Sequence, residues 1–432
     1  MKRSLVWFKT DLRLHDNEVL VEAISQSDEI VPVYCFDDKH FETNDFEFKK
    51  TGKFRAQFLI ESLIDLDNNL RALGSGLVIV KGIPEVELIQ VATLFNATKV
   101  FAKKEVAFEE LIAQHKVEQE LLKIECSLET FSTSTMYSKA DFPFQLETMP
   151  NVFTDFRKIV EGKSFIRDIF LPPENIHSPE IPFYPIPYLT DLGLNEFKPD
   201  CRAAFNFKGG ETEGKKRVNN YFFETHSIST YKMTRNELIG ENYSSKFSPW
   251  LALGCLSPRF VYAEIKNYEK GNVSNESTYW VIFELLWRDF FAFMMEKYPT
   301  EFFKKKGINN TISTTNTHQI DLFKKWQDGQ TENDFINANM MELNLTGFMS
   351  NRGRQNVASY LCHDMKLDWR YGAAYFEEQL IDYDVSSNWG NWAYIAGVGN
   401  NPRGVSVFNV NKQANDYDKN KSYRNLWLKH TE

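Results

Sequence analysis

Short apolar runs alternate with helical patterns over the first 130 residues. Strand-like runs fall at Ser4–Phe8, Ile30–Phe36, Leu77–Lys81, Lys99–Ala102 and Ile124–Phe131, and helical spacing falls between them at Asn17–Ser25, Gly52–Leu73, Pro84–Phe95 and Glu105–Leu122. Strands that alternate with helices form parallel sheets covered by helices on both faces. The pattern therefore predicts an α/β domain over residues 1–130, with a doubly wound, parallel, five-stranded sheet.

The pattern changes twice after residue 130. Nine prolines lie between residues 143 and 199 and break any long helix, so residues 131–205 are predicted to form an extended linker. Beyond it, Ser248-Pro249 and Ser257-Pro258 are typical of a helix N-cap followed by proline at the first helical position. Further helices are predicted at Ser277–Tyr298, Thr331–Leu343, Arg354–Leu361 and Trp369–Gln379. We expect an all-helical domain over residues 206–432.

The net charge of −9 is unevenly distributed. Residues 1–130 hold 16 basic and 23 acidic side chains, and the rest of the chain holds 34 and 36. The acidity belongs to the first domain, so the remainder is able to present a local basic face to DNA. Candidates are residues 401–432 and the cluster Lys208, Lys215, Lys216 and Arg217, with an ordinary solvated surface as the alternative for each.

Several classes of protein are disfavoured by what the sequence lacks. Five cysteines are scattered without a CxxC pair, no apolar stretch reaches a membrane span, and the start runs into the charged segment Lys9–Asp16. We expect a reduced, cytoplasmic, monomeric protein without membrane contact. No P-loop, GxGxxG, HExxH or Ser-His-Asp order is present, and the histidines show no metal-ligand spacing.

The segment Phe283–Phe291 concentrates unusual side chains. Along a predicted helix, Glu284 lies three residues before Trp287 and four before Arg288. This spacing places the three side chains on one face. A carboxylate, an indole and a guanidinium together would floor a pocket for a planar, polar ring. The alternative is an i,i+4 salt bridge beside a core tryptophan.

Three other segments suit a ligand that carries a heteroaromatic ring or phosphate. Arg354 in Asn351-Arg-Gly-Arg354 and Asp382 in Asp382-Tyr-Asp384 would either cradle a ring edge or lock two helices together. Tyr243–Ser248 places hydroxyls and a lysine before a helix start, which suits phosphate. Trp369, Trp389, Trp392 and Tyr394 either fill the core or form a hopping path for electrons, because indole is readily oxidised.

In this order, these segments resemble the photolyase/cryptochrome family of blue-light flavoproteins. The opening Trp7-Phe-Lys-Thr-Asp-Leu-Arg13, with Asp16-Asn17, is similar to that family's N-terminal motif. Ser350-Asn-Arg-Gly-Arg-Gln-Asn-Val357 and Ser387-Asn-Trp-Gly-Asn-Trp392 resemble the DASH-type cryptochromes. The resemblance covers nearly the whole chain, and it implies a helical domain that binds FAD bent into a U, with a folate antenna (5,10-methenyltetrahydrofolate) between the domains.

The resemblance also implies roles for single residues. Arg354 and Asp382 pair beside the isoalloxazine ring, Asp384 lies near its polar edge, and Asn388 faces its N5. Further FAD contacts are implied for Tyr231, Ser244, Ser245, Lys246, Phe247, Ser248, Glu284, Arg288 and Asn351. Glu110 matches the acid that contacts the folate antenna.

A photoreducing tryptophan chain is implied as well. Trp392 and Trp369 match its proximal and middle members, whereas the distal member, expected ten residues before Trp326, is replaced by Asn316. We therefore expect electron transfer to stop at Trp369 or to turn to another Trp or Tyr. Photoreduction would then be slower or shorter-lived than in relatives with the full chain.

The reaction that the resemblance implies is repair of cyclobutane pyrimidine dimers by an electron from excited, reduced FAD. Glu284 would hydrogen-bond the dimer, and Trp287 and Tyr394 would be the walls on which its flipped-out bases stack. Tyr394 stands where many photolyases have a second Trp, which is consistent with a preference for single-stranded or locally opened DNA.

Three alternatives remain at this stage. Repair of the (6–4) photoproduct is disfavoured because Ser350–Gln355 contains no histidine. A blue-light photoreceptor without significant repair is disfavoured by the short stretch after Lys412, and a light-indifferent flavin oxidoreductase by the missing nicotinamide motif.

Overall fold

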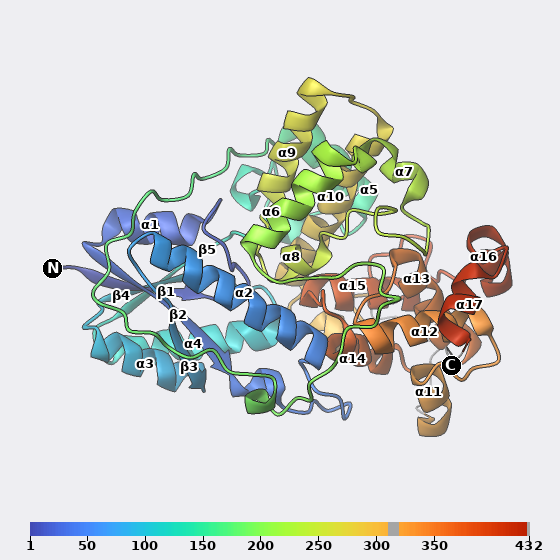
Figure 1. Cartoon of the computed structure of the whole chain (residues 1–432), viewed down its shortest axis with the longest axis horizontal. Helices are drawn as coiled ribbons and strands as arrows, with labels where there is room; N and C mark the ends of the chain where they lie inside the picture. Colours follow the sequence, from blue (N-terminus) through green and yellow to red (C-terminus); the bar gives the residue numbers. More distant parts are fainter. Residues whose placement is uncertain (310–318, 430–432) are drawn as a thin grey trace.

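The computed structural model describes residues 1–309 and 319–429. Its first part is a five-stranded parallel sheet of order β3-β2-β1-β4-β5, in agreement with the prediction (Figure 1). The strands are β1 (Arg3–Phe8), β2 (Glu29–Asp37), β3 (Val78–Gly82), β4 (Lys99–Lys103) and β5 (Ser127–Phe131). The helices α1 (Glu18–Gln26), α2 (Lys53–Ala72), α3 (Pro84–Leu94) and α4 (Phe108–Leu122) connect them in turn.

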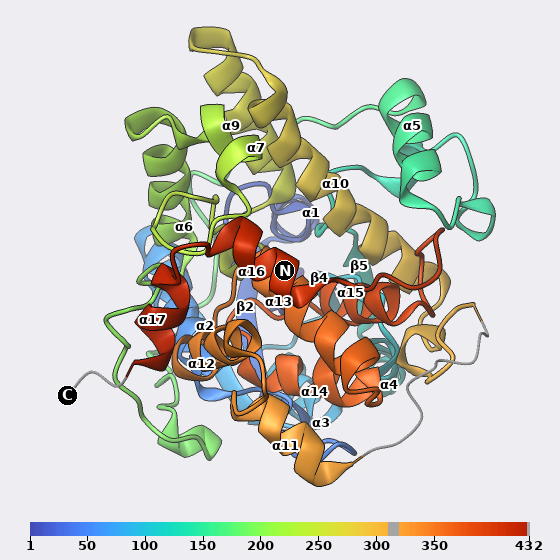
Figure 2. The same ribbon diagram turned by 90° about the vertical axis from the view of Figure 1, so that its right-hand side faces the viewer.

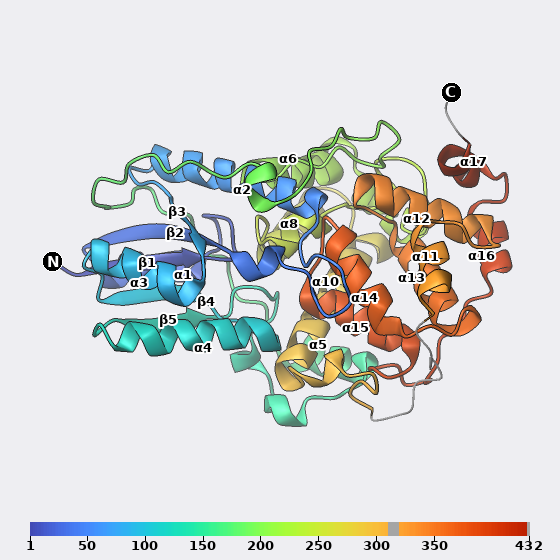
Figure 3. The same cartoon turned by 90° about the horizontal axis from the view of Figure 1, so that it is seen from below.

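Both faces of the sheet are buried because side chains alternate along each strand. In β1, Val6 and Phe8 join the core beneath α1 and α2, and Leu5 and Trp7 join a separate core beneath α3 and α4. Figure 1 shows α1 above the sheet and α3 and α4 below it, and Figure 3 looks onto the sheet from the side of α3 and α4. Strand β1 is apolar at consecutive positions because helices cover both of its faces.

Residues 164–205 run around the sheet domain, as predicted for a linker (Figure 1). The residues before them pack against helix α10 (Glu276–Lys297), where the Met136 and Tyr137 N–H groups donate to the Asp289 carboxylate. The Ile176 N–H donates to the Leu73 carbonyl and the Ile30 N–H to the His177 carbonyl, both at 2.9 Å. The prediction of an extended chain is wrong at α5 (Phe153–Lys163). This helix forms because no proline lies between Pro150 and Pro172.

From residue 211 onward, the described elements are helical, and α10 packs against α15, α7 and α5 (Figure 2). The α-helices are α6 (Glu211–Asn219), α7 (Tyr231–Thr234), α8 (Ser248–Ala252), α9 (Pro258–Gly271), α10 (Glu276–Lys297), α11 (Ile320–Gln327), α12 (Asp334–Thr346), α13 (Asn351–Ser359), α14 (Trp369–Gln379), α15 (Val385–Ala396), α16 (Val410–Tyr417) and α17 (Ser422–Leu428). Within the described ranges, no helix has the length and apolarity needed to cross a membrane.

Helix caps explain where the predicted boundaries differ from the structure. The helix predicted from Arg354 begins at Asn351, because the Ser350 hydroxyl caps it by accepting the Gly353 N–H at 3.0 Å. The helix predicted from Thr331 begins at Asp334, behind the Asn333 cap. In the first domain, α4 begins at Phe108 and not at Glu105.

Buried ion pairs join the sheet domain to the helical domain. The Arg259 guanidinium contacts both carboxylate oxygens of Asp16, at 2.7 and 3.1 Å, and Asp16 is fully buried. The Glu211 carboxylate accepts the Leu14 N–H at 2.6 Å and lies 2.8 Å from the His15 ring nitrogen Nδ1. These contacts fix the segment that follows β1 against α6 and α9.

Candidate active site and cofactor cavities

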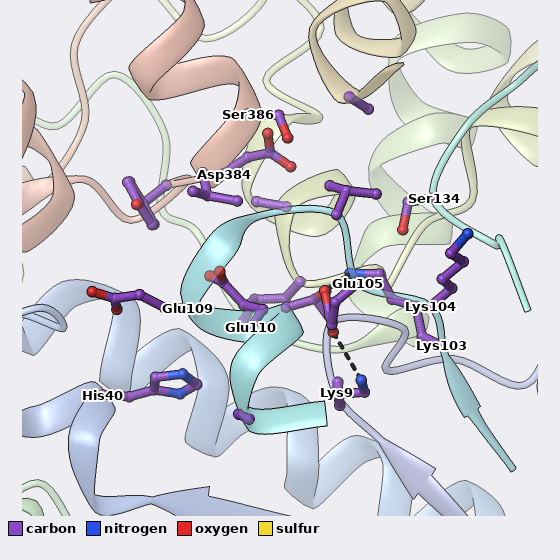
Figure 4. A pocket seen from close by; sticks show the side chains of 18 of the residues that line it. Lys9, His40, Lys103, Lys104, Glu105, Glu109, Glu110, Ser134, Asp384 and Ser386 are labelled. Atoms are coloured by element: carbon purple, nitrogen blue, oxygen red, sulfur yellow. Dashed lines mark hydrogen bonds and ion pairs between the residues drawn. The ribbon is translucent and has the colours of Figure 1, made fainter. Parts of the chain in front are cut away.

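A cavity of about 240 Å³ lies between the two domains, and we call it the interdomain cavity. The carboxyl ends of β1, β2 and β4 supply Lys9, Asp37 and Lys103 to its lining, and the helical domain supplies Asp384 and Ser386 from the opposite side (Figure 4). Ligands of open α/β sheets bind outside the carboxyl ends of the strands, where neighbouring connections diverge. The fold thus places a ligand site at this position.

The charged groups of the interdomain cavity fall into two sets. Glu105 forms ion pairs with Lys9 at 3.1 Å and with Lys103 at 3.3 Å (Figure 4). Burial alone would raise the pKa of Glu105, but these two cations hold it at about 2. Glu105 is therefore a carboxylate whose charge is already balanced within the protein.

Glu110 and Glu377 form the second set. Burial, assisted by the neighbouring Glu105 charge, raises the pKa of Glu110 to about 7. Burial likewise raises the pKa of Glu377 to about 7, although the Arg55 guanidinium opposes it. Near neutral pH, each carboxyl group can therefore either donate or accept a hydrogen bond at a ligand edge.

Arg288 reaches the wall of the interdomain cavity. Its guanidinium donates to the Ser134 carbonyl and to the Leu251 carbonyl, and it lies 3.5 Å from the Asp384 carboxylate. Glu284 is paired with Arg235 instead. The i,i+4 salt bridge considered as the alternative for Glu284 and Arg288 is thus not what the structure shows.

A second cavity lies within the helical domain, and we call it the helical-domain cavity. Its lining includes six of the predicted residues, namely Asn351, Arg354, Asp382, Asp384, Asn388 and Trp392, together with Tyr383. The Arg354 guanidinium contacts both Asp382 carboxylate oxygens, at 2.8 and 3.0 Å, and the Asp382 side chain is 1% exposed. Because α13 and α15 both start at this cavity, their first turns aim polar groups into it.

The predicted phosphate segment, Tyr243–Ser248, lies outside the lining of both cavities. Lys246 has a left-handed backbone with a φ of 60°, and its ammonium group lies 3.0 Å from the centre of the Tyr243 ring and 3.3 Å from the Ser244 hydroxyl. Burial lowers the pKa of Lys246 well below its ordinary value. Phe348 connects this segment to the helical-domain cavity, since Lys246 and Arg354 both lie over its ring.

The remaining members of this segment are held by their surroundings. The Arg217 guanidinium donates to the Ser245 carbonyl at 3.0 Å and to the Ser244 carbonyl at 3.3 Å. Phe247 is buried, and Ser248 begins the short helix α8.

Two further predicted residues, Glu284 and Trp287, lie one turn apart on α10, and a third, Tyr394 of α15, contacts Trp287. Trp287 stacks on Phe153 of α5, with ring centres 3.6 Å apart and planes 11° from parallel. Tyr394 meets Trp287 edge-on at 6.0 Å, which makes a corner of two aromatic walls. Glu284, one turn before Trp287, is partly exposed and forms an ion pair with Arg235, next to the buried Tyr231.

The buried tryptophans form two pairs, one between α14 and α15 and one between α15 and α11. Trp369 meets Trp389 at 5.8 Å, and Trp392 meets Trp326 at 6.2 Å. Asn316, where the distal tryptophan was expected, lies outside the described residues.

Family models and curated relatives match this chain over most of its length. The family model described as "DNA photolyase" matches residues 4–175, and that described as "FAD binding domain of DNA photolyase" matches residues 280–432. "Cryptochrome DASH" of Danio rerio is 46% identical over 97% of this chain and 82% of the relative. The chain belongs to the DASH-type cryptochromes of the photolyase/cryptochrome family.

Solved structures agree with this assignment. The cryptochrome of Synechocystis sp. PCC6803 superimposes with a TM-score of 0.96 at 43% identity, covering 99% of this chain and 89% of that one. A class III photolyase from Agrobacterium tumefaciens gives a TM-score of 0.84 at 25% identity, covering 99% and 86%. The fold of a DASH-type cryptochrome, with an FAD-binding helical domain, is thereby established for this chain.

The helical-domain cavity fits the flavin end of FAD. The Gln355 side-chain oxygen is buried there with no hydrogen-bond partner among the described residues, so it can accept a hydrogen bond from a ligand. The Asn388 amide spends one N–H on the Ala373 carbonyl, at 3.0 Å, and keeps its second N–H for the cavity. Arg354, charge-balanced by Asp382, would lie beside a ring that becomes anionic on reduction.

Three residues of the site were not predicted from the sequence. Arg235 lies 49 residues before its partner Glu284, and no local spacing connects the two. Phe153 lies in a segment predicted to have no helix. Glu377 belongs to helix α14, more than 260 residues after Glu110, and only the structure brings both to the interdomain cavity.

Proposed function

We propose that this DASH-type cryptochrome uses blue light to repair cyclobutane pyrimidine dimers, preferentially in single-stranded or locally opened DNA. Bound FAD, reduced and excited by light, supplies the electron that splits the dimer and then recovers it. The observation that carries the proposal is the corner of Trp287 and Tyr394 with the partly exposed Glu284 one turn away.

Only one face of the Trp287 ring is open to a base. Phe153 covers one face of Trp287, so a base stacks on the side that Tyr394 borders. Stacking of this kind contributes about 1–3 kcal/mol per base. Burial raises the pKa of Glu284, which favours a carboxyl group that shares its proton with a carbonyl of the dimer.

Light capture and electron supply use other residues in this proposal. The interdomain cavity would hold a folate antenna that captures light, and the Glu110 carboxyl, with a pKa of about 7, would hydrogen-bond its pterin edge. Trp392 and Trp369 supply the electrons that keep FAD reduced. Mass spectrometry of the chromophores released from purified protein identifies the antenna, and Glu110→Ala is expected to lose the folate while it keeps FAD.

The test of repair uses a single-stranded oligonucleotide with one thymine dimer. Reduced protein is illuminated with blue light, and restored thymines are counted by chromatography against a dark control. We expect Glu284→Ala and Trp287→Ala to lose repair and to keep their FAD. Glu276→Gln, an exposed carboxylate on the same helix, is the matched control and should repair normally.

Two outcomes would contradict the proposal. Full repair by both site variants would mean that the aromatic corner is not the lesion site. A wild-type protein that repairs nothing, yet binds a partner in a light-dependent way, would favour the photoreceptor.

A further inference from the structure

Trp389 joins the buried tryptophans of the helical domain to its half-buried aromatic rim. Its ring centre lies 5.8 Å from that of Trp369, which is fully buried. We propose that Trp389 donates the next electron after Trp369, so that the photoreducing path of this chain continues along α15. This inference concerns how FAD becomes reduced, and it holds whether or not the protein repairs DNA.

The first link of the path is set by the close approach of α14 and α15. Gly372, one turn after Trp369, faces the Trp392 indole so closely that a Cβ there would lie 2.3 Å from its Cη2 atom. Trp392 itself lines the helical-domain cavity. The helix that carries Trp369 therefore rests directly on the indole nearest the flavin site.

A competing branch leads from Trp392 to Trp326. The rings packed around Trp326 are Phe323, Tyr375 and Phe376, which are at most 4% exposed, and Trp326 itself is fully buried. A positive charge is costly in such a setting. An oxidised Trp326 would therefore return its charge to Trp392 sooner than pass it on.

Trp389 touches half-buried rings directly, whereas the rings around Trp326 reach half-buried ones, Phe48 and Tyr371, only one contact farther on. Hydrogen bonding does not separate the branches, because the Trp326 Nε1–H donates to the Val357 carbonyl at 3.0 Å and the Trp389 Nε1–H to the Tyr383 hydroxyl oxygen at 3.2 Å. Phe303 and Phe46, both half-buried, lie 4.9 and 6.5 Å from the Trp389 ring. Aromatic faces attract a cation, and these two rings lead from Trp389 towards solvent.

The transfer balances in electrons and requires no proton to leave. One electron passes from Trp389 to the oxidised Trp369, which returns to the neutral indole, and Trp389 becomes the one-electron-oxidised indole. An external one-electron reductant, such as a thiol, later restores Trp389.

The test is flash photolysis of the FAD-loaded protein without DNA, in the presence of a thiol. We expect Trp389→Phe to lower the yield of flavin reduction severalfold and to shorten the life of the tryptophan radical signal. Trp326→Phe tests the competing branch and should leave both values unchanged. Trp427→Phe is the matched control, because this buried indole of α17 lies beside Arg202 and outside the path.

A second variant keeps the proposal falsifiable if Trp389→Phe does not fold. In Trp389→Tyr, the broad tryptophan radical band should give way to the narrow band of a tyrosyl radical. Unchanged signals in the Trp389 variants, or losses in Trp326→Phe as large as those in Trp389→Phe, would overturn the proposal. A failure to repair dimers would leave it standing, since the measurement uses no DNA.

Discussion

At the scale of single residues, the Glu284 carboxyl lies between two opposing influences. Burial raises its pKa, and the Arg235 guanidinium lowers it. The balance decides how long the carboxyl keeps its proton as pH rises, and so whether it can donate a hydrogen bond to a dimer. In the proposed repair reaction, Arg235 would act through Glu284, as a positioning residue.

Arg235→Met is expected to raise the pKa of Glu284 further, because it removes the larger of the two influences that lower this pKa, the other being a hydrogen bond from Trp280. With protonated Glu284 as the active form, the fall of repair with rising pH should move to higher pH. The measurement is the pH profile of repair at saturating oligonucleotide. Lys232→Met, which removes a cation paired with the exposed Glu276, is the control, and a profile moved to lower pH would contradict the prediction.

Arg354 and Asp382 make a different kind of pair, because the Asp382 carboxylate is almost completely buried. Arg354→Met should lower the free energy of unfolding by about 3–5 kcal/mol, since it leaves an uncompensated buried charge. Urea unfolding of FAD-free protein measures this loss. The double variant Arg354→Met/Asp382→Leu should recover part of it, and equal instability of the two variants would count against a charge-based cause.

At the scale of elements, the contact of α14 with α15 depends on Gly372, which has no side chain to separate the two helices. Gly372→Ala would bring its Cβ to 2.3 Å from the Trp392 ring, so one of the two helices must shift. We expect a loss of about 1–3 kcal/mol in the free energy of unfolding and a displaced Trp392. Thermal unfolding measures the first effect and flavin fluorescence quenching the second.

Gly271→Ala at the end of α9 is the matched control, because its Cβ would meet nothing within 4 Å. Alanine favours a helix more than glycine does, so Gly271→Ala should lose no stability, and a similar loss in both variants would mean that the α14–α15 contact does not set the cost.

Elements with strong periodicity were predictable from sequence. The Trp369–Gln379 helix has the predicted bounds, and the five strands follow from apolar runs bounded by helical patterns. Contacts between distant elements were not predictable in the same way. Nothing in the linker indicated that Phe153 would stack on Trp287, because such a contact depends on how α5 packs against α10.

At the scale of the whole molecule, the interdomain cavity keeps its shape only while the sheet domain and the helical domain keep a fixed relation, since it takes its walls from both. The buried contacts of Asp16 with Arg259 and of Glu211 with His15 and Leu14 supply this relation. Their charges make the interface sensitive to acid.

Glu211 sets the pH range of this sensitivity. Burial alone would raise its pKa, but His15 and Lys215 hold it at about 2, below the ordinary value of 4.5. A depressed carboxyl pKa gives stability that is complete above pH 4.5 and is lost as pH falls towards 2. The full contribution is on the order of 3 kcal/mol.

Glu211→Gln should therefore be less stable than the wild type by a constant amount at neutral and weakly acidic pH. The difference should shrink to less than half near pH 3, because the wild-type carboxylate loses its advantage when it takes up a proton more readily in the unfolded chain. Urea unfolding at a series of pH values measures the difference. Glu213→Gln, a more exposed neighbour on α6 that pairs with Lys216, should show almost no difference at any pH. A gap between wild type and Glu211→Gln that widens on acidification would show that Glu211 does not hold the domains together as a carboxylate.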